Sequence, residues 1–272
     1  MSRKLFCEIS PLTYKISYES HILKRKIRDT FRVKIANKKS EKKLPYLVFK
    51  HESLIRRRLR KVSVPVEEAK VANLKIAAPK VNNVIIKPGE TFSFWSLVGR
   101  CTEQNGYQQG LMVANDGQLK KGTGGGLCQF SNLIHWMVLH TPLDIVEKYH
   151  HEQVDIFPDS DRKVPFGSGT SIVYNYLDYR FKNNTSQTYQ LVTYVGETHL
   201  HGELYCSAPQ NIIYKVEMEN ERFVKQGDQV YRCGKIYKRS FDNESNLLTN
   251  DLIQENHARV AYDTSHLNVI TE

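Results

Sequence analysis

The stretch GTGGGLCQFSNLIHW, from Gly122 to Trp136, constrains the fold more than any other part of the chain. Four glycines occupy five positions, a single cysteine follows, and the next residues carry apolar side chains at helical spacing. No helix breaker occurs between Gln129 and Leu139, and Thr141-Pro142 ends the run. The pattern predicts a flexible loop that becomes a helix buried in the core, with Cys128 in its first turn.

A cysteine in the first turn of a helix can act as a nucleophile. The unpaired N–H groups and the positive end of the helix dipole stabilise a thiolate, which can lower the pKa of a cysteine below its ordinary value of about 8.5. Gly124, Gly125 and Gly126 allow the loop to approach a ligand, and N–H groups from Gly126 to Cys128 can face an oxyanion. The alternative is a packed, unreactive thiol. The glycines lack the GK[ST] ending of a phosphate-binding loop.

A thiolate nucleophile usually needs a histidine. His150 and His151 follow an expected strand at Asp144–Tyr149. A cysteine on a helix followed by a histidine on a strand is the chain order of papain-like thiol enzymes. His135, two helical turns beyond Cys128, is predicted to be structural.

A third, polar residue should orient the imidazole. Ile172–Asn183 alternates in the manner of a strand that could lie beside the histidine strand. Asp178 in this segment is the first candidate, and Asn175 is the second.

The charge of the chain indicates anionic partners. Its 272 residues carry a net charge of +10 with a pI near 9.2, which favours nucleic acid, anionic lipid or an acidic wall polymer. No nucleic-acid-binding motif is present, so specific nucleic-acid binding is not predicted. The five cysteines are scattered and none forms a CxxC pair, which argues against a disulfide framework and a zinc site. We therefore predict no metal and no cofactor.

Three regions are expected. Residues 1–68 form a basic helical segment, 69–200 a core domain, and 201–272 a strand-rich extension packed on that core. The first region contains Leu23, Ile27, Phe31 and Ile35 at four-residue intervals, and a second basic stretch, SLIRRRLRKV. These indicate two helices that pack on the core with charged outer faces, or a surface that rests on anionic lipid or wall polymer.

Within the core domain we expect a helix over Ala69–Ala78 stopped by Pro79, and strands at Val84–Ile86 and Thr91–Trp95. QTYQLVTYVG and HLHGELYC continue as strands, and a hairpin is expected at Gly227-Asp228. The fold class is thus α+β: a core helix that carries the cysteine, packed on a mainly antiparallel sheet. No secretory signal or apolar run of membrane-spanning length is seen, which favours a cytoplasmic or membrane-peripheral location.

Four ordered motifs resemble the VanW family. They are KPGETFSFWSLVGRCTEQNGYQQGLMV, GGGLCQFSNLIHW, LDIVEKYHH and LDYRFKNNT, and the resemblance covers roughly Asn73 to Val195. The family takes its name from an accessory protein of glycopeptide-resistance clusters, and some relatives are described as L,D-transpeptidases of peptidoglycan. This resemblance implies that Cys128 is the nucleophile, that His151 is the catalytic histidine with His150 beside it, and that Asp178 completes the site.

The resemblance also places Gln129 next to the nucleophile, so Gln129 and His150 join the three glycines as predicted oxyanion- or substrate-binding residues. FGSGTS stands where relatives carry a Gly-Arg-Asp stretch, so their substrate contacts there do not transfer. The predicted function is a cysteine-dependent acyltransferase that acts on peptidoglycan stem peptides or their precursors, which would place it in the cell envelope. The alternative is a non-catalytic basic module that binds a wall precursor, an anionic membrane or a partner protein.

Overall fold

The computed structural model describes residues 5–56, 64–113, 119–150, 154–156 and 164–271. Its helices are α1 (Pro11–Arg32), α2 (Val64–Val81), α3 (Phe94–Val98) and α4 (Cys128–Leu139), with short 3-10 helices η1 (Phe6–Glu8) and η2 (Glu103–Asn105). Its strands are β1 (Tyr46–Leu54), β2 (Val84–Ile86), β3 (Thr91–Ser93), β4 (Gln109–Val113), β5 (Leu119–Thr123), β6 (Asp144–Glu147), β7 (Val154–Asp155), β8 (Arg180–Lys182), β9 (Tyr189–Val195), β10 (His199–Cys206), β11 (Ile213–Gln226), β12 (Gln229–Phe241), β13 (Leu247–Val260) and β14 (Val269–Thr271).

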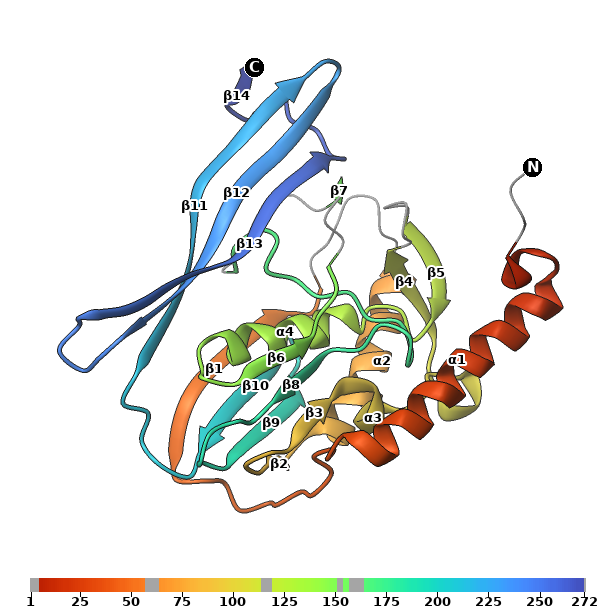
Figure 1. Ribbon diagram of the computed structural model, residues 1–272. Helices are drawn as coiled ribbons and strands as arrows, with labels where there is room; N and C mark the ends of the chain where they lie inside the picture. Colours follow the sequence, from red (N-terminus) through yellow and green to blue (C-terminus); the bar gives the residue numbers. More distant parts are fainter. Residues whose placement is uncertain (1–4, 57–63, 114–118, 151–153, 157–163, 272) are drawn as a thin grey trace.

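These strands form four separate sheets, of which the one that contains β11, β12 and β13 projects from the rest (Figure 1). The sheet β1-β10-β9-β2 is antiparallel throughout, and α4 packs on β1 and β10 while α2 packs on β9. A second antiparallel sheet has the order β3-β8-β6, and β4 pairs with β5. The predicted α+β class with mainly antiparallel sheets is therefore confirmed. None of the described helices is both long and apolar enough to cross a membrane.

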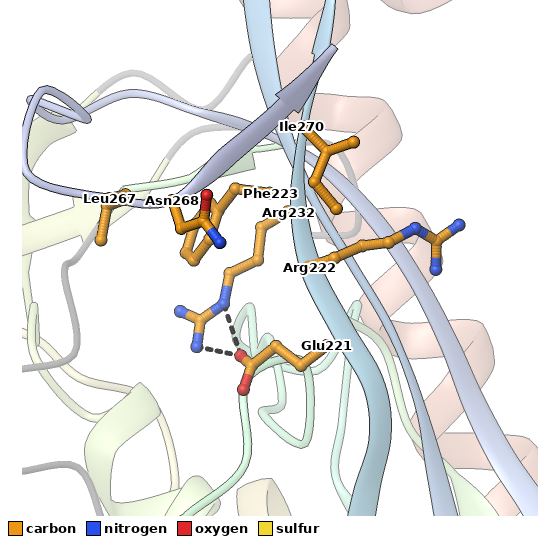
Figure 2. A pocket seen from close by; sticks show the side chains of 7 residues that line it. All are labelled: Glu221, Arg222, Phe223, Arg232, Leu267, Asn268 and Ile270. Carbon is orange, nitrogen blue, oxygen red and sulfur yellow. Dashed lines mark hydrogen bonds and ion pairs between the residues drawn. The ribbon is translucent and has the colours of Figure 1, made fainter. Parts of the chain in front are cut away.

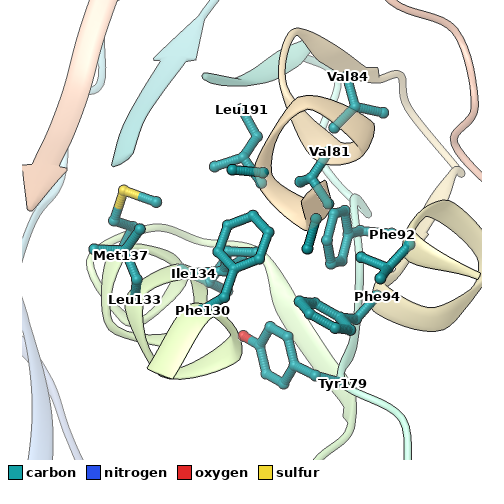
Figure 3. Packing of buried hydrophobic residues seen from close by; sticks show 14 of the residues in the cluster. Val81, Val84, Phe92, Phe94, Phe130, Leu133, Ile134, Met137, Tyr179 and Leu191 are labelled. Carbon is teal, nitrogen blue, oxygen red and sulfur yellow. The ribbon is translucent and has the colours of Figure 1, made fainter. Parts of the chain in front are cut away.

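The predicted core helix is present and buried. Phe130, Ile134 and Met137 of α4 are fully buried, and Phe130 faces Phe94 across the core (Figure 3). Each such side chain contributes about 1.5–3 kcal/mol by leaving water. The helix starts at Cys128 rather than after it. The core therefore fixes α4, and with α4 the position of the cysteine.

The close approach of α4 to β10 depends on a glycine. A Cβ at Gly202 would lie 2.5 Å from Cε of Met137 and 3.0 Å from Cδ2 of Leu133. Only glycine, which has no side chain, allows helix α4 to pack this close to strand β10. The strand alternation of HLHGELYC predicted β10, and the contact explains why it contains a glycine.

The long helix α1 contradicts one prediction. Leu23, Ile27 and Phe31, expected to pack on the core, are 58%, 51% and 83% exposed. The inner face is charged instead, because Arg25 pairs with Glu147 and donates to the backbone of the 173–177 turn. Four-residue spacing predicts a helix but does not decide which face turns inward; here buried ion pairs decide it.

The second basic stretch is not a helix where it is described. Its first residues, Ser53 and Leu54, end strand β1, and residues 57–63 lie outside the described residues.

The helix expected over Ala69–Ala78 is α2, which runs on to Val81 and includes Pro79 in its last turn. Near a helix end the proline removes only one bond, so it does not stop the helix at once.

Three strand predictions were too long. The strand expected at Asp144–Tyr149 is β6, which ends at Glu147. The segment Ile172–Asn183 contains only the short strand β8, because Val173 and Leu177 close a tight turn in which Asn175 has φ = 49°. Asparagine tolerates this left-handed conformation better than most residues. The strand expected at Thr91–Trp95 ends at Ser93, whose Oγ accepts a hydrogen bond from the N–H of Ser96 and caps α3.

The C-terminal sheet has the order β14-β11-β12-β13-β7, and the predicted hairpin at Gly227-Asp228 joins β11 to β12. A cavity of about 370 Å³ opens beside Arg232 (Figure 2). The guanidinium there is buried, pairs with Glu221 and Asp155, and lies 4.5 Å from the ring centre of Phe166. These contacts give Arg232 a structural role that ties β7 to the sheet.

Candidate functional site

The turn between β5 and α4 positions Cys128. Gly124 has φ = 80° and Gly126 has φ = 93°, conformations that favour glycine over all other residues. The N–H of Gly125 donates to the carbonyl of Gly122 at 3.0 Å, and the N–H of Gln129 donates to the carbonyl of Gly126 at 3.1 Å. The glycines therefore allow a compact turn that passes directly into the helix.

This turn is packed rather than open. A Cβ at Gly124 would lie 2.6 Å from Cβ of Cys101, and one at Gly125 would overlap the backbone of Gly110. The buried Asn73 of α2 donates to the carbonyl of Gly125 at 2.9 Å. The predicted flexible loop is thus held between α2 and β4.

The packing engages the backbone amides of two glycines that were predicted to bind the oxyanion or the substrate. The N–H of Gly124 donates to the carbonyl of Gln108 at 3.0 Å, and the N–H of Gly125 bonds within the turn. Contact of Gly126 with a substrate oxyanion stays a prediction. Gln129 is also engaged, because its amide donates to Oγ of Ser53 and to the carbonyl of Leu54, both at 2.8 Å. It anchors α4 to β1.

Cys128 is half-buried as a residue, and its sulfur is buried within hydrogen-bond reach of two backbone amides. Burial raises the pKa of the Cys128 thiol, and the N–H groups of Ile172 and of Cys128 itself act against that rise. The lowering of this pKa by the helix end is therefore outweighed: the helix end is present, but loss of water around the sulfur raises the pKa by more. No sequence signal pointed to Ile172, which directly follows the FGSGTS segment (166–171).

That segment is fastened to α4 beside the cysteine. Oγ1 of Thr170 lies 2.6 Å from Oγ of Ser131, and the N–H of Thr170 donates to Oδ1 of Asn132 at 2.6 Å. Ser131 in turn donates to the carbonyl of Cys128 at 3.0 Å. These bonds hold the Ile172 amide against the sulfur.

The same segment brings His150 towards the site. The N–H of Ser171 donates to the carbonyl of Tyr149 at 2.6 Å, so the two backbones run side by side. A Cβ at Gly169 would lie 3.2 Å from Cε1 of His150 and 3.6 Å from Oδ1 of Asn132, one helical turn beyond Cys128. His150 therefore packs against the segment that also contacts the sulfur. His151 lies outside the described residues.

Asp178 is fully buried and heavily bonded. Its carboxylate accepts hydrogen bonds from Oγ of Ser93 (2.6 Å), Nε of Arg180 (2.7 Å) and the N–H groups of Trp95 (3.0 Å) and Tyr179 (2.9 Å). These four donors give it a structural role at the junction of β3, α3 and β8. Its predicted action on His151 stays a prediction.

The neighbouring charges form one network. Arg180 donates to Asp29 of α1 at 2.5 Å, and Arg25 and Glu147 complete the set. Burial alone would raise the pKa of Asp29, but the hydrogen bond and charge of Arg180, with Arg25 and Arg28, hold that pKa below its usual value. Asn175, the second candidate for orienting the histidine, donates instead to the carbonyl of Ile22 in α1 at 3.3 Å.

Comparison with known proteins gives a consistent assignment. The family model described as "VanW like protein" matches residues 69–205. The Vancomycin B-type resistance protein VanW of Enterococcus faecalis is 35% identical over 196 residues, which cover 72% of this chain and 70% of that protein. The uncharacterised protein YoaR of Bacillus subtilis is 33% identical over 115 residues, 42% of this chain and 36% of YoaR.

This chain thus spans about a third of YoaR. No solved structure matches the chain. The family model covers half of the chain and includes Cys128, His150, His151 and Asp178, and the Enterococcus faecalis protein is matched over most of its length. On this similarity, the chain belongs to the VanW family.

Proposed function

We propose that this protein is a cysteine acyltransferase of the L,D-transpeptidase type that acts on peptidoglycan stem peptides and contributes to glycopeptide resistance. One observation carries the proposal: the sulfur of Cys128 lies at the start of a buried helix between the N–H groups of Cys128 and Ile172. N–H groups this close to the nucleophile can donate to the oxyanion that forms on the carbonyl carbon under attack. The name of the Enterococcus faecalis relative supports the link to resistance.

The reaction would proceed in two steps. As Sγ of Cys128 attacks the carbonyl carbon of a bond between an L-centre and a D-centre residue, its proton passes to the imidazole of His151 or His150. The tetrahedral oxyanion accepts hydrogen bonds from Cys128 and Ile172, and the C–N bond breaks while the imidazolium protonates the leaving amine. An acceptor amine, or water, then attacks the thioester and releases the thiol.

The raised pKa of Cys128 adds a requirement. Because burial favours the neutral thiol, proton removal must accompany the attack, and a histidine must act as general base. Asp178 would then act as a positioning residue, through the strands that hold the histidine segment. This differs from an enzyme whose cysteine is already ionised before the substrate binds.

The test is formation of a covalent acyl-enzyme. Wild-type protein incubated with a stem tetrapeptide or a carbapenem-like probe should gain the acyl mass on Cys128, as measured by intact-protein and peptide mass spectrometry. Cys128→Ala should abolish this adduct. Cys101→Ala is a matched control, since Cys101 is also half-buried, beside the same glycine turn, and burial raises its pKa to about 11. Wild-type protein that never acquires the mass would refute the proposal.

A separate observation favours a second function, docking on an anionic membrane. The outer face of α1 carries Leu12, Ile16, Leu23 and Ile27, which are 50–67% exposed. Basic residues flank this stripe on both sides: Lys15, Lys24, Lys26 and Arg28. A helix with apolar residues outward and lysines alongside fits a lipid interface better than a hydrophilic wall polymer, which offers nothing to bury the apolar side chains.

Vesicle sedimentation tests this second function. The protein should bind vesicles that contain phosphatidylglycerol more strongly than vesicles of phosphatidylcholine alone, and Leu23→Glu together with Ile27→Glu should remove the binding. Leu248→Glu with Leu252→Glu is the matched control, because these residues are similarly exposed on β13. Equal binding by all three proteins, or none by the wild type, would contradict it. Loss of a dimer in the α1 variant would show that a second copy covers the stripe instead.

A further inference from the structure

A second cavity lies in a different part of the molecule, where the last turns of α4 and strand β6 meet β12 and β13; Figure 1 shows these elements. It measures about 320 Å³. Its apolar walls are Leu139, Leu143, Ile145 and Ile253, and its polar groups are His135, Asp144, Lys148 and Lys238. It belongs neither to the Cys128 site nor to the Arg232 cavity. A mostly apolar cavity with a few convergent polar groups is the usual form of a small-molecule site.

His135 is the central polar group of this cavity. The side chain is 1% exposed, and its Nδ1 lies 3.2 Å from the hydroxyl of the fully buried Tyr179. Its other ring nitrogen, Nε2, is buried and has no hydrogen-bond partner among the described residues. A buried polar atom left unpaired is destabilising by about 1–3 kcal/mol, which a bound ligand would offset.

The contact of Nδ1 with Tyr179 allows two neutral tautomers of His135. Burial raises the pKa of Tyr179, so the phenol is neutral and its O–H can donate to Nδ1. Burial lowers the pKa of His135 well below its ordinary value, and the nearby charges of Lys148, His150 and Lys238 lower it further. In the neutral tautomer whose Nδ1 accepts from Tyr179, the Nε2–H is available to donate.

The charges around the cavity are predominantly positive. Nζ of Lys238 donates to the carbonyl of Thr141 at 2.7 Å and lies 4.7 Å from the ring centre of Tyr214. Nζ of Lys148 donates to Oε1 of Gln254 at 3.3 Å. The carboxylate of Asp144 accepts a hydrogen bond from Asn184. Among the residues that line the cavity, two ammonium groups thus outnumber the single carboxylate; Asp251 of β13, opposite Lys238, adds a second carboxylate outside the lining.

We propose that this cavity binds a carboxylate joined to a small apolar body. One carboxylate oxygen accepts the hydrogen bond of His135 Nε2, the charges of Lys148 and Lys238 balance the anion, and the apolar part packs on Leu139 and Ile253. A phosphate dianion fits less well, because the cavity offers one fixed buried donor and mostly apolar walls. His135 follows Cys128 by seven residues, about 10 Å along the helix, so the ligand would bind apart from the sulfur.

The first experiment uses the wild-type protein and three probes. Butyrate should bind, whereas butyramide, its neutral analogue, and inorganic phosphate should not. An NMR titration should show a His135 Nε2–H signal in the free protein that shifts when butyrate is added. Binding of butyramide as strong as that of butyrate, binding of phosphate alone, or a proton found on Nδ1 would overturn the proposal.

Two variants localise the binding. His135→Asn keeps an acceptor near Tyr179 but removes the Nε2 donor, and it should weaken butyrate binding by about 10- to 100-fold, the loss expected for a hydrogen bond to a charged group. His135→Gln places an amide donor near the Nε2 position and should retain more affinity. Lys238→Met should weaken binding, whereas Lys235→Met, on the same strand and exposed, should not. Affinities equal to the wild type in His135→Asn and Lys238→Met would also overturn it.

Neither experiment depends on Cys128 chemistry. Cys128→Ala should bind butyrate like the wild type, so failure of the acyltransferase proposal and failure of this one can be told apart. If the His135 variants do not fold, the NMR titration of the wild-type protein still tests the proposal, because it reports whether butyrate shifts the Nε2–H signal.

Discussion

Substitution of Asp178 by asparagine separates a structural from a catalytic role for this carboxylate. The side chain is fully buried and accepts four hydrogen bonds, of which the 2.7 Å bond from Nε of Arg180 is charged. Removing one partner of a buried ion pair is destabilising by about 3–5 kcal/mol. Asp29, 2.5 Å from Arg180, and Glu147 remain in Asp178→Asn, so we expect the lower end, about 3 kcal/mol. For a chain of this size that corresponds to a fall in Tm of roughly 6–12 °C.

Thermal unfolding followed by circular dichroism measures this fall, and Asp228→Asn, an exposed aspartate in the β11–β12 hairpin, serves as the control. The alkylation rate of Cys128 and its pH profile, measured well below the Tm, should match the wild type if Asp178 is structural. A wild-type Tm combined with a lost or shifted pH profile would refute the reasoning. That result would place Asp178 on the catalytic histidine, as the family resemblance implies.

Three further predictions concern the site and its supports. Alkylation of Cys128 by iodoacetamide should be slower at pH 7 than that of a free thiol and should keep rising above pH 8.5, because burial raises its pKa; a plateau below pH 8 would contradict this. The folded pKa of Asp29 lies below its unfolded value, so its stabilisation is present above about pH 4 and lost as the pH falls further. Asp29→Asn should therefore flatten the dependence of Tm on pH between about 5 and 3, and an unchanged slope would oppose it. Gly125→Ala should lower the free energy of unfolding by at least about 1–3 kcal/mol, because the added Cβ would overlap Gly110. Gly89→Ala is the control: its Cβ would have no neighbour within 4 Å, so only the smaller strain of a positive φ is expected. Equal losses of stability in denaturant unfolding would argue against the packing of the glycine turn.

The periodicity of apolar residues predicted local structure well where a single helix or strand accounts for the whole pattern. The apolar run after Cys128 is a buried helix, and the alternating segments at 189–195 and 199–206 are adjacent antiparallel strands. The hairpin at Gly227 also follows from a residue that tolerates positive φ. These features depend on local conformation and on one face meeting the core.

Periodicity failed where distant contacts compete with it. The alternation over 172–183 suited a strand, but the left-handed Asn175 and its contact with α1 turn the chain instead. In α1 the apolar spacing was correct, yet the inner face is the charged one because Arg25 and Asp29 meet Glu147 and Arg180 there. Neither partner is close in sequence, so no window of residues could reveal the pairing.

The sequence by itself determined that a cysteine begins a core helix after a glycine turn, because helix periodicity and glycine geometry are local properties. Only the tertiary structure decided the state of that cysteine. The amide of Ile172 reaches it through the segment at 168–172, against which His150 also packs, and the bonds of this segment to α4 join residues some forty positions apart. The burial that follows raises the pKa of Cys128 despite the helix end. Desolvation depends on every group around an atom, and that information is held in the packed fold rather than in any short stretch of the chain.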